Sequence, residues 1–146
     1  MIYLVDIDGT VADPTHRLHF IQDKPADWKA FFAACPDDKP IPEVIEVVRA
    51  LAFHGDLLYM MTGRSDAVRY ETGCWLNSYF IPFYRLWMRA DGDHREDSVV
   101  KSEMLDKLLS SHEITEIAGV FEDRQQCVDM YRARGLRVFQ VAEGKF

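Results

Sequence analysis

The chain has 146 residues, the usual size of one domain, and its hydrophobic share of 48% is enough to build a buried core. Its formal net charge of −7 argues against broad, non-specific binding to nucleic acid but leaves room for a local basic patch that holds one phosphate. No apolar stretch approaches the roughly 18–20 residues that cross a bilayer, and Asp6 interrupts the apolar N-terminal run, so we expect neither a membrane span nor a signal peptide.

The three cysteines, Cys35, Cys74 and Cys127, are far apart and odd in number. Their spacing matches neither a zinc site nor a disulfide framework. We therefore expect reduced, mostly buried thiols and a cytoplasmic protein.

Residues 1–5 are almost wholly apolar and rich in β-branched and aromatic side chains, which predicts a strand buried on both faces. Asp6 and Asp8 follow where this strand ends, and Gly9 and Thr10 are turn residues. Because the two carboxylates repel each other, the pair suggests a hard cation such as Mg²⁺ at this point. A pair of solvated turn aspartates is the alternative interpretation.

Residues 14–42 are predicted to form a small insertion rather than a second domain, because they contain too few apolar residues to fold alone. Two short amphipathic pieces, residues 16–21 and 26–34, precede a loop rich in Pro and Asp at residues 36–42.

The second amphipathic piece begins with the sequence Asp27-Trp28-Lys29-Ala30-Phe31-Phe32, and Asp27 is suited to the start of a helix. The aromatic residues Trp28, Phe31 and Phe32 favour packing within the insertion, with a base-stacking platform as the alternative.

The rest of the chain alternates helices and strands. Helices are predicted over residues 42–53, about 66–79, 98–109 (capped by Ser98) and 125–134, and strands over residues 57–61, 84–88, 117–121 and 136–141. This alternation predicts a three-layer α/β/α, Rossmann-like fold with a central parallel sheet.

Polar side chains follow the first four predicted strands. They are Asp6 and Asp8, Thr62 and Arg64, Arg89 and Arg95, and Glu122 and Asp123. Because parallel strands with right-handed connections end at one edge of the sheet, we expect these side chains to converge there.

These motifs resemble the haloacid dehalogenase superfamily of phosphotransferases. The segment 6–10 matches its first motif, Thr62 the second, Lys101 the third and Glu122-Asp123 the fourth. Further segments are similar to the 3′-phosphatase domain of phage-type polynucleotide kinase–phosphatases, namely residues 62–64, 92–97, 99–101, 122–124, 130–132 and 140–144. The chain departs from that pattern at Glu122, where the relative has Asp, and in the insertion.

The resemblance implies a single phosphatase domain over residues 1–146 that removes 3′-phosphates from DNA or RNA ends with the help of Mg²⁺. A small-molecule phosphatase or 5′-nucleotidase with the same machinery is the alternative. The sequence contains no Gly-x-x-x-x-Gly-Lys-Ser/Thr motif, so we expect no kinase domain in this chain.

By the same resemblance, Asp6 is the nucleophile that forms an aspartyl-phosphate, and Asp8 is the general acid and base. Mg²⁺ would be held by Asp6, the backbone carbonyl of Asp8 and Asp123, with Glu122 bound directly or through water.

Thr62 and Lys101 would bind the phosphoryl oxygens. Thr62 also suits a cap for the following helix. Lys101 lies in the first turn of a predicted helix, where a cation is unfavourable against the dipole, and this favours a site role over a solvated lysine. Asp97 either caps that helix or orients Lys101.

The remaining candidates are substrate-binding residues: Arg17, Gly63, Arg64, Arg89, Arg95 and Asp97. Arginine forks suit phosphate recognition, and Arg64 and Arg95 are favoured over Arg17 and Arg89 because they match the relative more clearly.

Overall fold

The computed structural model of the protein describes residues 1–144. Its centre is a sheet of five strands, β1 (Ile2–Val5), β4 (Leu57–Ser65), β5 (Arg85–Arg89), β6 (Ile117–Glu122) and β7 (Val138–Gln140). The strands are ordered β5-β4-β1-β6-β7, and every neighbouring pair is parallel, as predicted. The strand that directly precedes the two aspartates, β1, therefore lies in the middle of the sheet.

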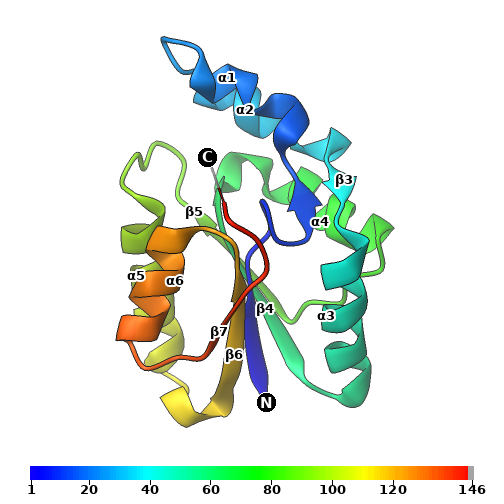
Figure 1. The fold of residues 1–146 in the computed structure, drawn as a ribbon, viewed down its shortest axis with the longest axis vertical. Helices are drawn as coiled ribbons and strands as arrows, with labels where there is room; N and C mark the ends of the chain where they lie inside the picture. Colours follow the sequence, from blue (N-terminus) through cyan, green and yellow to red (C-terminus); the bar gives the residue numbers. More distant parts are fainter. Residues whose placement is uncertain (145–146) are drawn as a thin grey trace.

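Four longer helices cover the two faces of the sheet and produce the predicted three layers (Figure 1). They are α3 (Pro42–His54), α4 (Arg69–Ser78), α5 (Asp97–Leu109) and α6 (Gln125–Ala133). Short 3₁₀ turns, η3 (Asp66–Val68) and η4 (Ile114–Glu116), precede α4 and β6.

Alternate side chains of the strands build two separate apolar layers, because successive residues of a strand point to opposite faces. Leu4 and Met61 belong to the layer shared with α5 and α6. Val5 and Met60 belong to the layer shared with α3 and α4. This two-sided burial explains why the strands are continuous apolar runs in the sequence.

The insertion forms a small cap above the carboxyl ends of the strands (Figure 1). Its elements are β2 (Ala12–Asp13), η1 (Thr15–Arg17), α1 (His19–Gln22), α2 (Trp28–Ala33), η2 (Cys35–Asp37) and β3 (Lys39–Pro40). The antiparallel pair of β2 and β3, which the sequence did not predict, closes the base of the cap. The side chain of Asp27 accepts a hydrogen bond from the amide of Ala30 and caps α2, as expected.

Several predicted boundaries differ from the structure. The predicted cap at Ser98 is wrong, because α5 already begins at Asp97, with Glu96 at the cap position. Strand β4 continues through Ser65, so Thr62 and Arg64 lie within the strand rather than after it. Residues 66–68 form a 3₁₀ turn, and α4 begins only at Arg69.

The cysteines agree with the sequence prediction, since all three are free and Cys35 and Cys127 are buried, while Cys74 is exposed. Within residues 1–144, no helix has both the length and the apolar character that a membrane span requires.

The central position of β1 can be tested through Leu4, which has no exposed surface. Leu4→Ala should lower the free energy of unfolding by about 2–5 kcal/mol, because a cavity remains in the packed layer. Urea denaturation measures this change, with Phe53→Ala as the control at an exposed site, where about 0.5 kcal/mol or less is expected. Equal losses in the two variants would contradict this description of the core.

Candidate active site

The polar residues at the carboxyl edge of the sheet surround one pocket with a volume of about 760 Å³. Its wall includes residues from the ends of β1, β4, β5 and β6, from the start of α5 and from the cap: Asp6, Asp8, Thr62, Gly63, Arg89, Asp97, Glu122, Asp123 and the aromatic residues of α2. The convergence expected from the parallel topology is therefore present.

Three carboxylates form an acidic triad on the floor of this pocket: Asp6, Glu122 and Asp123. One oxygen of each lies within 4.8 Å of the others, and all three residues are buried. Burial and the neighbouring carboxylate of Glu122 raise the pKa of Asp6 well above its ordinary value and the pKa of Asp123 to about 7. An added positive charge would relieve this repulsion.

Lys101 supplies part of that charge. Its Nζ donates to Asp6 Oδ1 at 2.6 Å and to Glu122 Oε2 at 2.7 Å, and the side chain is almost fully buried. Burial acts to lower the pKa of Lys101, but the carboxylates of Asp6 and Glu122 outweigh it and hold the pKa above its usual value. This position excludes a solvated surface lysine. Because α5 begins at Asp97, Lys101 is its fifth residue and lies just beyond the first turn in which the sequence analysis placed it.

Asp123 is the member of the triad without a partner. Both of its carboxylate oxygens are buried and accept no hydrogen bond. A side chain at Gly9 or Gly144 would place a Cβ 2.1 Å or 2.4 Å from Asp123 Oδ2, so only glycine fits against this carboxylate. The orphaned oxygens and the all-oxygen donor set fit a hard divalent cation, which Asp6, Glu122 and Asp123 are placed to hold.

Asp8 occupies a different environment, between two buried guanidinium groups. Arg64 Nη2 donates to Asp8 Oδ1 at 2.7 Å, and Arg17 Nη2 donates to the same oxygen at 2.5 Å. Burial acts to raise the pKa of Asp8, but Arg64 and Arg17 outweigh it and hold the pKa at about 2. Asp8 is therefore ionised at neutral pH. The pKa values of Asp6 and Asp123, in contrast, are raised.

The two arginines do not line the pocket, because both are fully buried behind Asp8. A kink in β4 explains the position of Arg64. Thr62 pairs with Met88 and Ser65 with Arg89, so Gly63 and Arg64 form a bulge without partners in β5. Bulges redirect side chains, and this one turns Arg64 toward Asp8 rather than toward a bound substrate.

Asp38 completes this arrangement, although it was not among the site residues predicted from the sequence. Its carboxylate accepts from Arg17 Nε and Nη2 at 2.7 Å and from Arg64 Nη2 at 2.6 Å. Asp38 is buried beside the exposed Asp37, and both belong to a segment that looks like a solvated loop in the sequence. Only the fold distinguishes these two neighbours.

Asp97 organises a second group of arginines at the pocket wall. Its carboxylate accepts from Arg89 Nη2 and from Arg124 Nη1, the latter at 2.7 Å. The hydrogen bond to Lys101 that would orient the lysine is not formed. A Cβ at Gly63 would lie 2.3 Å from Asp97 Oδ1, which explains why glycine occupies this position. Arg124 was not among the predicted site residues, although it directly follows the fourth motif.

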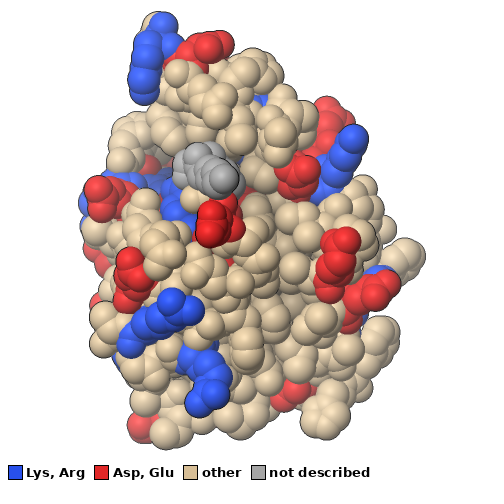
Figure 2. Space-filling view, viewed as in Figure 1, with Lys and Arg blue, Asp and Glu red and all other residues tan. Residues whose placement is uncertain are grey.

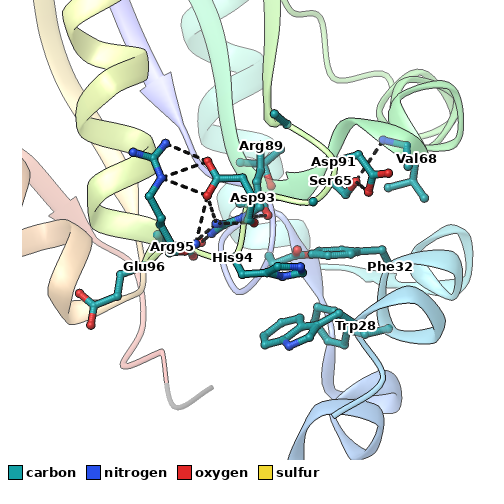
Figure 3. A pocket seen from close by; sticks show the side chains of 18 of the residues that line it. Trp28, Phe32, Ser65, Val68, Arg89, Asp91, Asp93, His94, Arg95 and Glu96 are labelled. Carbon is teal, nitrogen blue, oxygen red and sulfur yellow. Dashed lines mark hydrogen bonds and ion pairs between the residues drawn. The ribbon is translucent and has the colours of Figure 1, made fainter.

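The last two predicted residues differ in their distance from the acidic triad. Thr62 is fully buried on the pocket floor, and its Oγ1 accepts from the amide of Arg64 at 3.2 Å. It does not cap α4, which begins at Arg69. Arg95 lies at the rim with a half-exposed side chain that pairs with Asp93 (Figure 3) and with Glu103. The structure therefore does not bring Arg95 into contact with the acidic triad.

Comparison with known proteins identifies the family. A family model described as the polynucleotide kinase PNKP phosphatase domain, of the haloacid dehalogenase type, matches residues 1–146. The chain belongs to this family. The resemblance seen in its motifs is thereby confirmed, and the fold is that of haloacid dehalogenase phosphatases.

Two similar proteins are larger than this chain. A protein of Autographa californica nuclear polyhedrosis virus, assigned as a bifunctional polynucleotide kinase/RNA ligase, is 30% identical over 131 residues, which is 88% of this chain and 17% of the viral protein. A chain in the structure of the Pnkp1/Rnl/Hen1 RNA repair complex is 27% identical with a TM-score of 0.80, and the match covers 99% of this chain and 43% of that one. The chain thus spans less than half the length of these relatives.

Other phosphatases share the fold at lower identity. The class C acid phosphatase from Bacillus anthracis, solved with tungstate bound, is 14% identical with a TM-score of 0.69 over 99% of this chain and 67% of that one. At this identity the comparison supports the fold alone.

The contribution of Asp38 can be measured directly. Asp38→Asn keeps the shape of the side chain but leaves two buried guanidinium groups with one carboxylate fewer. We expect a loss of about 3–5 kcal/mol in the free energy of unfolding, measured by urea denaturation. The adjacent Asp37→Asn is a matched control at an exposed position, with an expected change within about 0.5 kcal/mol. If the two variants unfold alike, Asp38 does not hold the arginine pair.

Proposed function

We propose that the chain is a Mg²⁺-dependent phosphomonoesterase that removes 3′-phosphates from DNA or RNA ends through an aspartyl-phosphate intermediate, with residues 1–146 acting as one domain. The observation that carries this proposal is the placement of two aspartates two residues apart in opposite electrostatic environments. Asp6 lies beside Glu122, Asp123 and Lys101, whereas Asp8 is held by Arg17 and Arg64. Two carboxylates with divergent pKa values suit two different roles in one reaction.

In the first step, a carboxylate oxygen of Asp6 attacks phosphorus, and the bond from phosphorus to the 3′-oxygen breaks. The leaving oxygen takes up one proton. Lys101 lies beside Asp6, and Thr62 lies on the pocket floor. The ammonium group of the first and the hydroxyl of the second stabilise the negative charge on the transferring phosphoryl oxygens. Mg²⁺, when bound by the acidic triad, reduces the repulsion between the anionic carboxylate and the anionic phosphate.

In the second step, water attacks the aspartyl-phosphate, and the bond between phosphorus and Asp6 breaks to release inorganic phosphate. Asp8 accepts the proton of this water. Its pKa of about 2 means that Asp8 is a carboxylate at neutral pH, which is the protonation state that accepting a proton requires. For the first step, Asp8 must relay a proton that arrives with the substrate, and a phosphate monoester with a second pKa of about 6 carries one in its monoanionic form.

The polynucleotide substrate is supported by the family to which the chain belongs and by the viral and RNA repair relatives. The surface charge fits recognition of an end rather than of a long backbone. Figure 2 shows basic side chains interspersed with acidic ones on the face in view, without a continuous basic surface. We further propose a cytoplasmic setting and that any kinase or ligase activity resides outside this chain.

The nucleophile and the substrate can be tested together. Asp6→Asn should reduce turnover by more than about a thousandfold, because an amide is a very poor nucleophile. Phosphate release is measured on matched oligonucleotides with a 3′-phosphate or a 5′-phosphate and on a 3′-mononucleotide, and the wild type should prefer the 3′-phosphorylated oligonucleotide.

In the same assay, Asp37→Asn is the control and should retain wild-type rates. Substantial turnover by Asp6→Asn would exclude the aspartyl-phosphate mechanism. Equal rates on the mononucleotide and the oligonucleotide would favour the small-molecule phosphatase instead.

The metal site can be tested without turnover. At a free Mg²⁺ concentration ten times its Kd, the ion should stabilise the wild type by about 1.4 kcal/mol, which raises Tm by roughly 3–6 °C. Asp123→Asn should remove most of this gain, whereas Asp129→Asn, on the exposed side of α6, should keep it. An unchanged Mg²⁺ response in Asp123→Asn would rule out the proposed site.

The pH dependence of the same measurement follows from the raised pKa of Asp123. Since its pKa of about 7 in the folded protein exceeds the ordinary value of 3.8, the metal-free protein loses stability as pH rises through about 7. Asp123→Asn should lack this loss. Because Mg²⁺ competes with the proton, the gain in Tm should be larger at pH 8 than at pH 6 in the wild type, and a larger gain at pH 6 would contradict the assignment.

A further inference from the structure

The side of the pocket formed by the cap is apolar and aromatic rather than charged. Trp28, Phe31 and Phe32 of α2 all line it, and their spacing places them on one face of the helix. Phe31 is buried, whereas Trp28 remains 45% exposed and Phe32 is half-buried. We call Trp28 and Phe32 the aromatic wall.

The aromatic wall is fixed relative to the catalytic carboxylates through Arg17. The guanidinium of Arg17 lies 4.2 Å from the centre of the Phe31 ring, and Arg17 Nη1 donates to the carbonyl of Phe31 at 3.3 Å. The same guanidinium holds Asp8. Phe31 in turn contacts both rings of the wall, with centroid distances of 5.8 Å to Trp28 and 5.4 Å to Phe32. The packing role that the sequence favoured for these aromatics is thus fulfilled by Phe31 and in part by Phe32, one side of which packs against the cluster of Cys35, Val68 and Met88.

A third ring faces the wall from the opposite side of the pocket mouth. Figure 3 shows His94, from the loop between β5 and α5, pointing toward Trp28 and Phe32. Among the described residues, the ring of His94 makes no aromatic contact with the ring of Trp28 or of Phe32. The mouth of the pocket is therefore bordered by aromatic rings on two sides while its floor carries the acidic triad.

We propose that the aromatic wall and His94 stack on the nucleobase of the nucleotide whose 3′-phosphate reaches Asp6, so that Trp28 and Phe32 determine the preference for a nucleotide over other phosphate esters. This inference rests on the proposed function. Stacking contributes without regard to base identity, because every base presents a π-face. Arg17 links the wall to Asp8, so a stacked base positions the phosphate relative to both carboxylates.

The test compares two substrates that differ only in the base. One is an oligonucleotide with a 3′-phosphorylated thymidine at its end, and the other ends in a 3′-phosphorylated tetrahydrofuran nucleotide, which has no base. Wild-type kcat/KM should be higher on the first by about five- to 150-fold. Trp28→Ala should lower the rate on the thymidine end to near that on the base-free end and leave the latter unchanged, whereas Trp28→Phe should retain most of the preference.

Phe32→Leu is a second variant that preserves apolar volume in case Trp28→Ala destabilises the cap, and it should also reduce the preference for the base. Phe53→Ala, far from the pocket on α3, should change neither rate. A wild type that releases phosphate equally from both substrates would overturn the stacking proposal and leave the proposed function standing. Equal losses on both substrates in Trp28→Ala and Phe32→Leu would also overturn it, and no release from either substrate by the wild type would overturn both.

Discussion

The site depends on how the negative charge of the buried acidic triad, at the ends of β1 and β6, is neutralised. Lys101 neutralises Asp6 and Glu122 together, and Asp123 is left with two buried oxygens that accept no hydrogen bond. Buried carboxylates without partners are unfavourable, so the sheet edge holds a local deficit of positive charge that a cation can fill. The close packing of Gly9 and Gly144 against Asp123 maintains this arrangement, because it leaves the carboxylate no room to turn away.

A second balance of charge joins the cap to the sheet. Arg17 comes from the cap and Arg64 from β4, and both bind Asp8 and Asp38. The indole nitrogen of Trp75 in α4 donates to the carbonyl of Asp38 at 2.9 Å and fixes the end of the cap to the body of the domain. The position of the cap and the ionisation of Asp8 are therefore controlled by the same buried side chains.

Much of the fold could be predicted because strands that are buried on both faces appear in the sequence as continuous apolar runs. The apolar run before Asp6 and the alternation of strands and helices determine a parallel sheet, and the strand ends then locate the acids. The pairing of β2 with β3 could not be predicted in this way, because each strand has only two residues and shows no pattern of apolar side chains. The start of α5 was misplaced because Glu96, Asp97 and Ser98 are all acceptable near a helix N-terminus, and sequence preference alone does not separate them.

The site was predicted less completely, for a related reason. Residues that touch the reacting atoms have characteristic types at characteristic positions, whereas the residues that hold them do not. Asp38 and Arg124 emerge only when distant segments are brought together, and Arg95 matches a family segment but points to the rim. Arg89 lies just before that segment, and it is buried and packed against Gly63 and Asp97. The sequence analysis favoured Arg95 over Arg89 because of its clearer match, and only the packing of the two side chains shows that Arg89 is the more buried.

Because of the bulge in β4, the site depends on the number of residues in this strand and not only on their types. Because side chains alternate between the two faces of a strand, removing one residue at Gly63 would turn Arg64 away from Asp8 without altering the apolar residues before it. Such a deletion would spare the two core layers and separate the guanidinium from its carboxylate. An insertion or deletion at this point therefore breaks the same buried ion pairs, to Asp8 and Asp38, as a substitution of Arg64 itself, although every residue type is kept.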